Sequence, residues 1–115
     1  MTYIDGFVAA VKADQKDAYM AHAKKMVEVF KDHGVTRVVD TWGDDIPDGE
    51  MTSFPMAVKA EADEVVVLSW LVWPSRDARM AGVQKIMTDP RITNEHMPFD
   101  GKRMIWGGFD VFLDE

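Results

Sequence analysis

Three histidines are the residues best suited to acid–base chemistry near neutral pH, because imidazole titrates there. His22 lies on the apolar stripe of a predicted helix, in a row with Met26, Val29 and His33. It could act as a base aimed into a pocket, or it could simply pack its ring at the helix edge. His96 lies in a loop that could close over a pocket, although exposed loop histidines are common. His33 is at a helix end, where the helix dipole favours a positive charge.

Asp40 offers a second candidate for proton transfer. It falls on a predicted strand and shares a face with Trp42, while Arg37 lies on the other face. A buried Asp40 would have a perturbed pKa and would be a candidate proton acceptor. The alternative is a strand-end carboxylate that pairs with an arginine or a backbone N–H. The candidate catalytic residues are therefore His22, Asp40 and His96.

Aromatic side chains are the most informative set in the sequence. Four tryptophans fall on predicted strands, at Trp42, Trp70, Trp73 and Trp106. A half-barrel lined by such residues could hold a flat hydrophobic molecule, which makes Trp42, Trp70 and Trp106 candidate pocket residues. The alternative is that they anchor a dimer interface, where tryptophan is common. The nine methionines suit either reading, since methionine fills irregular gaps and adapts to ligands.

Several kinds of site are excluded by what the chain lacks. There is no cysteine, which excludes disulfides, Fe–S clusters, thiolate zinc sites and a cysteine nucleophile. No histidine has the H-x-E, H-x₃-H or E-x-x-H spacing of a metal ligand pair. The acidic loop after Trp42 lacks the residue order of a calcium loop, and its acids are Asp44, Asp45, Asp48 and Glu50. We therefore expect no metal site and no cofactor.

The charge balance narrows the possible partners. The chain has 13 Lys and Arg against 20 Asp and Glu, a net charge of −7. This excess of acid opposes binding to nucleic acid or to an anionic membrane. No apolar run is long enough for a transmembrane helix, and no positive segment precedes the first apolar run as in a signal peptide. We expect a single cytoplasmic domain over residues 1–115.

Hydrophobic periodicity predicts four strands and two helices. The strands are expected at 3–11, 35–42, 64–73 and 103–113, and the helices from Asp17 to Asp32 and from a Ser75 cap to about Met87. Asp14 or Asp17 should cap the first helix, and His33-Gly34 should end it. A further short strand is expected within 54–60, and a loop over 91–101. Gly107-Gly108 indicates a bulge or a close backbone approach in the last strand.

The β-α-β-β-α-β order predicts an α+β fold of the ferredoxin-like type, an antiparallel sheet with both helices on one face. The segment 64–73 is apolar on both of its faces, so the face without helices must find another apolar surface. In a chain this short the obvious supplier is a second copy. We expect a homodimer formed through the open sheet face, a dimeric α+β barrel.

Four separated segments also resemble one family: YIDGFVAAV, VVDTWGDDIPDG, FPMAVKAEADEVVVLSWLVWPS and MPFDGKRMIWGGF. They resemble the uncharacterised bacterial proteins known as domain of unknown function 1428, over nearly the whole chain. The resemblance implies the dimeric α+β-barrel superfamily, in agreement with the predicted topology. Cofactor-independent monooxygenases, haem proteins and stress-response barrels share this architecture, so the fold does not choose among them. The resemblance implies no catalytic residue.

Two functions remain open at this point. The first is a non-enzymatic dimeric protein that binds a small hydrophobic molecule. The second is a cofactor-independent monooxygenase or isomerase acting on an aromatic substrate, with His22, Asp40 or His96 in acid–base roles. A filled interior would argue against the enzyme, and a cavity above ~300 Å³ beside Asp40 or His22 would favour it.

Overall fold

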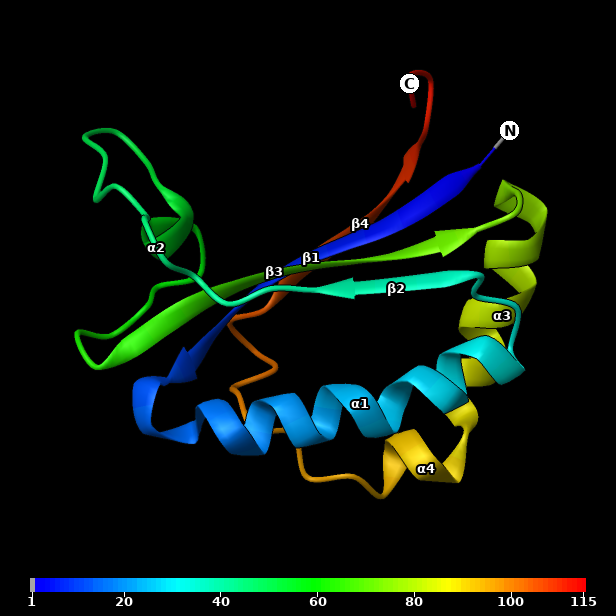
Figure 1. Cartoon of the computed structure of the whole chain (residues 1–115), viewed down its shortest axis with the longest axis horizontal. Coiled ribbons are helices and arrows are strands. Elements are labelled where there is room, and N and C mark those ends of the chain that lie inside the picture. Colours follow the sequence, from blue (N-terminus) through cyan, green and yellow to red (C-terminus); the bar gives the residue numbers. More distant parts are fainter. Residues whose placement is uncertain (1) are drawn as a thin grey trace.

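The computed structural model describes residues 2–115. Its elements are β1 (Tyr3–Lys12), a 3-10 turn (Ala13–Gln15), α1 (Lys16–Asp32), β2 (Arg37–Asp40), α2 (Phe54–Ala57), β3 (Glu64–Trp73), α3 (Arg76–Thr88), α4 (Pro90–Thr93) and β4 (Ile105–Asp110). The strands form one antiparallel sheet in the order β2-β3-β1-β4. With α1 and α3 each connecting two strands, this is the ferredoxin-like α+β fold that the sequence predicts (Figure 1). Within the described chain, no helix combines the length and the apolar character needed to cross a membrane.

The two faces of the sheet have different neighbours. The helices α1, α3 and α4 lie on one side of the sheet, and the segment that contains α2 lies on the other (Figure 1). Side chains alternate between the faces along a strand, so the odd-numbered residues of β1 and β3 point to the helices. On this side Tyr3, Leu71 and Trp73 form a buried cluster with Ile86 of α3. A smaller cluster on the other side packs Val58, which follows α2, against β1 and β3.

The rest of that second side has no helix over it, and we call it the open face. The pairing of the strands assigns to it Ile4, Val39, Leu68, Trp70, Val72, Ile105 and Phe109. Three of these apolar side chains are well exposed: Leu68 at 39%, Ile105 at 47% and Phe109 at 58%. Both faces of β3 are therefore apolar, and the face away from the helices is covered only in part, where Val58 packs on Val66.

The sequence predicted some of the residues that begin and end the helices, but not all of them. The Ser75 hydroxyl accepts a hydrogen bond from the Ala78 backbone N–H at 3.0 Å, which confirms the predicted cap of α3. Gly34 follows α1 with φ of +108°, as expected for a glycine after a helix. The predicted cap of α1 by Asp14 or Asp17 is wrong. A 3-10 turn precedes the helix instead, Gln15 is its N-cap, and no side chain makes a capping bond there.

Residues 54–60 do not form the predicted strand. They begin with the short helix α2, because the Ser53 hydroxyl accepts from the Met56 N–H at 3.1 Å and Pro55 fits a first helical turn. The second and fourth strands are shorter than predicted, since the ladder ends at Asp40 and Asp110. The loop predicted over 91–101 holds part of the short helix α4, whose N-cap is Asp89.

The glycine pair of β4 causes no bulge, so that alternative is wrong. The pairing of β1 with β4 runs without interruption from Tyr3 with Asp110 to Val8 with Ile105. A close approach does occur, but it involves a side chain rather than backbone. A Cβ added to Gly108 would lie only 2.5 Å from the Tyr3 hydroxyl oxygen. Glycine is therefore needed here to make room for the Tyr3 ring.

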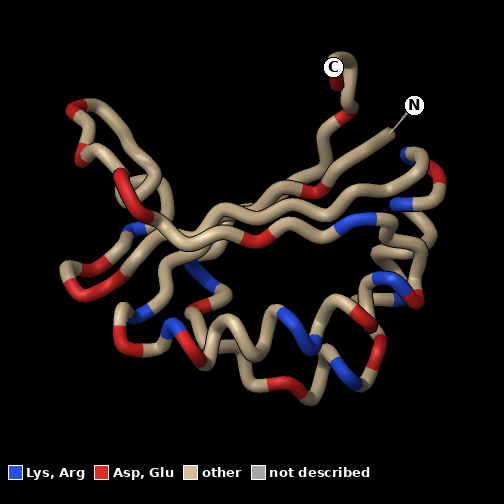
Figure 2. The backbone as a smooth tube through the Cα atoms, in the orientation of Figure 1, with Lys and Arg blue, Asp and Glu red and all other residues tan. Residues whose placement is uncertain are grey.

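The acidic loop between β2 and α2 projects from the sheet edge. Figure 2 shows red carboxylate positions along this loop and beside the start of β3. All four predicted loop acids are exposed, at Asp44, Asp45, Asp48 and Glu50. Part of the negative charge of the chain is thus solvated at one end of the molecule.

Candidate functional site

A cavity of about 240 Å³ lies between the sheet and the helices. Its walls are mainly apolar and come from both layers. The sheet contributes Phe7, Val38, Leu71 and Trp106, α1 contributes Ala23, Met26 and Phe30, and α3 contributes Val83, Ile86 and Met87. The remaining apolar wall comes from the chain between α3 and β4, with Ile92, Met97, Phe99 and Met104. Only four lining residues carry polar side chains, namely Asp5, Tyr19, His22 and Asp40.

Asp40 forms a small polar cluster with Tyr19. The Tyr19 hydroxyl donates to Asp40 Oδ1 at 2.7 Å, and the Thr41 backbone N–H donates to the same oxygen at 3.1 Å. Burial raises the pKa of Asp40 above its usual range, and the hydrogen bonds from Tyr19 and Thr41 oppose the rise. Burial, with the neighbouring carboxylate, also raises the pKa of Tyr19, which keeps the phenol protonated as a donor. Asp40 is nevertheless exposed rather than buried, so it lies at the rim of the cavity.

Ser69 lies beside this cluster on β3. It pairs across the sheet with Asp40 on one side and with Phe7 on the other, so it shares their face. Its side chain is buried, and its hydroxyl has no hydrogen-bond partner among residues 2–115. A buried hydroxyl without a partner is uncommon and marks the Asp40 side of the cavity as incompletely satisfied.

His22 lines the cavity from α1 and is held by an acid. Its Nδ1 lies 3.3 Å from Glu95 Oε1, and Lys25 Nζ lies 2.9 Å from the other oxygen of Glu95. The pKa of Glu95 is lowered, first by Lys25 and then by His22. The edge of the His22 ring also meets Phe99, with centroids 6.5 Å apart. His22 thus joins α1 to the segment that follows α4.

The other polar side of the cavity is a buried ion pair. Asp5 on β1 is 3% exposed and accepts from Arg79 Nε and from Arg79 Nη2, the latter at 2.6 Å. Trp73 Nε1 donates to the same carboxylate at 2.8 Å. The Arg79 guanidinium also lies over the rings of Tyr3 and Trp106, 5.8 and 5.7 Å from their centroids. The hydrogen bonds that Arg79 donates to Asp5 raise the pKa of Arg79 and leave its charge paired.

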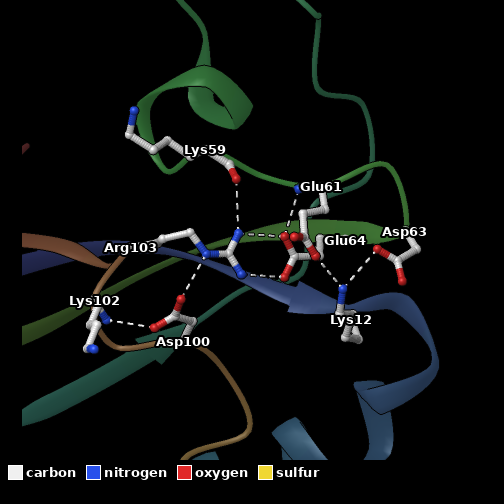
Figure 3. A network of polar contacts seen from close by, with 8 residues as sticks. All are labelled: Lys12, Lys59, Glu61, Asp63, Glu64, Asp100, Lys102 and Arg103. Carbon is white, nitrogen blue, oxygen red and sulfur yellow. Dashed lines mark hydrogen bonds and ion pairs between the residues drawn. The ribbon is translucent and has the colours of Figure 1, made fainter.

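A strap formed by residues 94–104 closes one side of the cavity with Met97, Phe99 and Met104. Glu95 fastens one end of the strap to α1, as described above. Arg103 fastens the other end to β3, through bonds of 2.7 and 2.8 Å to the two oxygens of Glu64 (Figure 3). Arg103 also donates to Asp100 and to the Lys59 carbonyl oxygen. Paired in this way, the Glu64 carboxyl has its pKa lowered to about 2.

The structure brings together three of the candidate residues and separates three others. His22, Asp40 and Trp106 line the same cavity. Trp42 packs on the Tyr19 ring at 6.0 Å but does not line it, and Trp70 lies on the open face. His96 is exposed on the outer surface of the strap, in a second depression of about 320 Å³ that His22, Lys25 and Glu95 also line.

Sequence reasoning missed Asp5, Tyr19 and Arg79 as parts of this site. One signal was present, because Asp5 is an acid among apolar residues on the same parity of its strand. A carboxylate on a buried strand face needs a cationic or N–H partner, so its position already called for one. Nothing local identified Arg79 as that partner, since the two residues are 74 positions apart.

The cavity can hold a small apolar molecule beside one carboxylate and one imidazole. Its volume of about 240 Å³ is below the ~300 Å³ that would favour an enzyme, whereas the depression beside His22 and His96 reaches about 320 Å³. Across residues 2–115, no three His, Asp or Glu side chains are placed to share a metal ion. The chemistry that the lining residues offer is therefore hydrogen bonding and proton transfer.

Comparison with known proteins supports the resemblance seen in the sequence. Residues 2–101 match the family described as protein of unknown function, DUF1428. The uncharacterized protein YbaA of Escherichia coli K12 is 55% identical to this chain, and so is that of Shigella flexneri. Each match covers 100% of this chain and 100% of the relative. An uncharacterized NIPSNAP domain protein from Burkholderia xenovorans has a TM-score of 0.56 at 11% identity, covering 98% of this chain and 99% of that one. A dimeric ferredoxin-like protein from an uncultured marine organism has the same TM-score and identity over 100% of both chains. With the ferredoxin-like fold and four matching segments already in place, the chain belongs to the DUF1428 family.

Proposed function

We propose that this protein is a homodimer that binds a small hydrophobic molecule in the cavity between its sheet and its helices. The observation that carries the proposal is the cavity itself, which is lined by apolar side chains from the sheet, both long helices and the strap. Ligand sites in proteins are typically concave and mainly apolar, with a few polar groups that fix orientation. The Asp40 cluster supplies such polar groups. A cytoplasmic location stays a prediction, which fractionation of cells would test.

The open face supports the dimeric part of the proposal. Exposed apolar residues there lie on two strands, Leu68 on β3 and Ile105 and Phe109 on β4, with β1 between them. Two segments rise on the same side of the sheet, the loop around α2 and the C-terminal tail (Figure 1). They carry the most exposed apolar side chains described, Met51 at 96% and Phe112 at 90%. A second copy on the open face would remove this surface from water. One structural neighbour is itself described as dimeric.

Binding of benzofuran, a small neutral aromatic molecule, tests the cavity. Isothermal titration calorimetry on the full chain should detect binding, and Ala23→Phe should abolish it, because Ala23 lines the cavity and a phenyl ring there would fill it. The matched control is Ala21→Phe, on the exposed side of the same helix, which should bind as the wild type does. Equal binding by both variants, or none by the wild type, would contradict the proposal.

The dimer is tested by sedimentation equilibrium. The wild type should behave as twice the 13.0 kDa chain at tens of micromolar, and Phe109→Asp should shift it to the monomer by placing a charge in the open face. Met20→Asp is the matched control, since Met20 is exposed on α1, away from the open face. A wild-type protein that remains monomeric would contradict the proposed homodimer.

A second candidate function is a cofactor-independent monooxygenase or isomerase acting on an aromatic substrate. It is favoured by one observation, that Asp40 and His22 line the same apolar cavity. Asp40 could accept a proton from an acidic carbon of the substrate and return it at another position, with no change in oxidation state. Exchange of solvent deuterium into 2-indanone by the wild type, and not by Asp40→Asn, would support the isomerase. An oxygen electrode would detect the monooxygenase, which must consume O₂ with its substrate.

A further inference from the structure

We propose that the cavity selects small neutral aromatic molecules that carry one ring hydroxyl or ring N–H, and that it rejects aromatic carboxylates. The inference rests on the proposed function, because it specifies the chemical class of the ligand at the same site. Three features of the molecule support it: the volume of the cavity, the free oxygen of Asp40, and the pairing of His22 and Arg79 with carboxylates of the protein.

The volume limits the ligand to a small aromatic molecule. An apolar cavity of roughly 150 Å³ accommodates benzene. In proportion, the cavity of about 240 Å³ accommodates ~10 non-hydrogen atoms. One substituted ring or two fused rings fit this limit. A long acyl chain or a dinucleotide does not.

Asp40 provides an acceptor that the protein leaves unused. Its two hydrogen bonds, from the Tyr19 hydroxyl and the Thr41 N–H, both end on Oδ1. Oδ2 accepts no hydrogen bond from any residue of the described chain. A ligand O–H or N–H that reaches Oδ2 would form a charge-assisted hydrogen bond, which is stronger than a neutral one. A ligand without a donor would displace water from Oδ2 and leave it unpaired.

The basic side chains His22 and Arg79 both contact carboxylates of the protein. His22 is the one basic side chain among the lining residues, and its Nδ1 already faces Glu95. Arg79 approaches from α3, but its Nε and Nη2 are bound to Asp5. A ligand carboxylate beside Asp40 would therefore meet a like charge, and such repulsion weakens binding even at a rim that solvent reaches.

Three probes of equal size separate these effects: indole has a ring N–H, benzofuran has none, and benzoate is an anion. Calorimetry on the full chain should give an affinity for indole roughly 10-fold or more above that for either of the others, as expected for a hydrogen bond to a charged group. In Asp40→Asn the advantage of indole over benzoate should fall several-fold, because the acceptor is weaker and the repulsion is gone. The control Asp45→Asn removes the same charge from the exposed loop and should leave the order unchanged.

The outcomes distinguish this inference from the proposed function. Benzoate binding as tightly as indole to the wild type would overturn the inference, and so would an indole preference that Asp40→Asn leaves intact. In both cases binding of benzofuran would still support a hydrophobic ligand site. Failure of all three probes to bind would overturn both proposals. The wild-type ranking does not depend on whether the variant folds.

Discussion

Two carboxylates on the same face of the sheet, Asp5 and Asp40, differ in what surrounds them. Asp5 lies on β1 and Asp40 on β2, with β3 between them, and both line the cavity. Asp5 accepts from the guanidinium of Arg79 and from the Trp73 indole, and it is 3% exposed. Asp40 accepts from one hydroxyl and one backbone N–H, both on one oxygen, and no arginine or lysine of the described chain forms an ion pair with it.

Because of this difference, Asp5 stabilises the fold, whereas Asp40 is available to bind a ligand. The charge of Asp5 is matched by a rigid, bidentate partner, so a ligand has little to gain from it. Asp40 keeps an unneutralised charge at the rim and an oxygen with no protein partner. Removing the charge from each residue should therefore have opposite effects on stability.

The largest effect is expected from Asp5→Asn. It leaves the Arg79 cation without its counter-charge in a buried site, a change that typically costs about 3–5 kcal/mol in the free energy of unfolding. Urea denaturation at a fixed protein concentration measures it. The control is Asp63→Asn at the exposed pair with Lys12, where the side chains are 69% and 43% exposed, and its cost should stay below ~1 kcal/mol. Equal costs for the two variants would show that the Asp5 pair does not hold the fold.

Gly82→Ala should give the next largest loss of stability, because it disturbs the packing of Trp73, the residue that donates to Asp5. A Cβ at Gly82 would overlap the Trp73 ring and the His33 carbonyl oxygen. Overpacking of this kind costs roughly 1–3 kcal/mol, and it should shift the Trp73 indole away from Asp5. Thermal unfolding gives the magnitude. Gly101→Ala, where an added Cβ would meet nothing within 4 Å, is the matched control and should be close to neutral.

Glu64 is a second carboxylate that is paired with an arginine, and it does not line the cavity. It therefore tests whether pairing with arginine is enough to make a carboxylate stabilise the fold. Hydrogen bonds from Arg103 lower its pKa from 4.5 to about 2. The folded state therefore binds this proton less readily than the unfolded chain, and the stabilisation present above pH 4.5 is lost as the pH falls toward 2. Urea midpoints across this range should fall less steeply in Glu64→Gln than in the wild type. The exposed neighbour Glu61→Gln should keep the wild-type slope, and an unchanged slope in Glu64→Gln would contradict the assignment.

Asp40→Asn should have the smallest effect, and with the opposite sign to Asp5→Asn. Because burial raises the pKa of Asp40, its ionised form is less stable in the folded protein than in the unfolded chain at neutral pH. Replacing the charge removes that cost, so the urea midpoint should rise slightly. Asp45→Asn corrects for the general benefit of reducing the net charge of −7. A midpoint below that of Asp45→Asn would mean that Asp40, like Asp5, holds the fold.

Patterns within ten to twenty residues were sufficient for most of the architecture. The segment 64–73 is apolar except at Glu64 and Ser69, and β3 spans the same residues. The stripe of the first helix and the Ser75 cap are also local features, and both are present. The errors arose where two local signals competed. At Phe54–Ala57 the Ser53 cap and Pro55 outweighed the apolar character that suggested a strand.

The site depended on contacts that no local pattern encodes. Tyr19 meets Asp40 across 21 positions, and Arg79 meets Asp5 across 74. Strand parity placed Asp40 and Trp42 on one face, but Trp42 follows the end of β2 and packs against Tyr19 instead of entering the cavity. Trp106 lines the cavity because its strand pairs with β1 so that Trp106 stands opposite Phe7.

Composition and periodicity thus determined the secondary-structure elements and their order. They also determined the apolar open face and the types of chemistry available. All of these follow from residue types and short-range spacing. Only the tertiary structure decided which acid is neutralised and which is left with a free oxygen. That outcome depends on the register of the strands and on the side chains that α1 and α3 bring over the sheet. Both are set by packing between residues far apart in the chain.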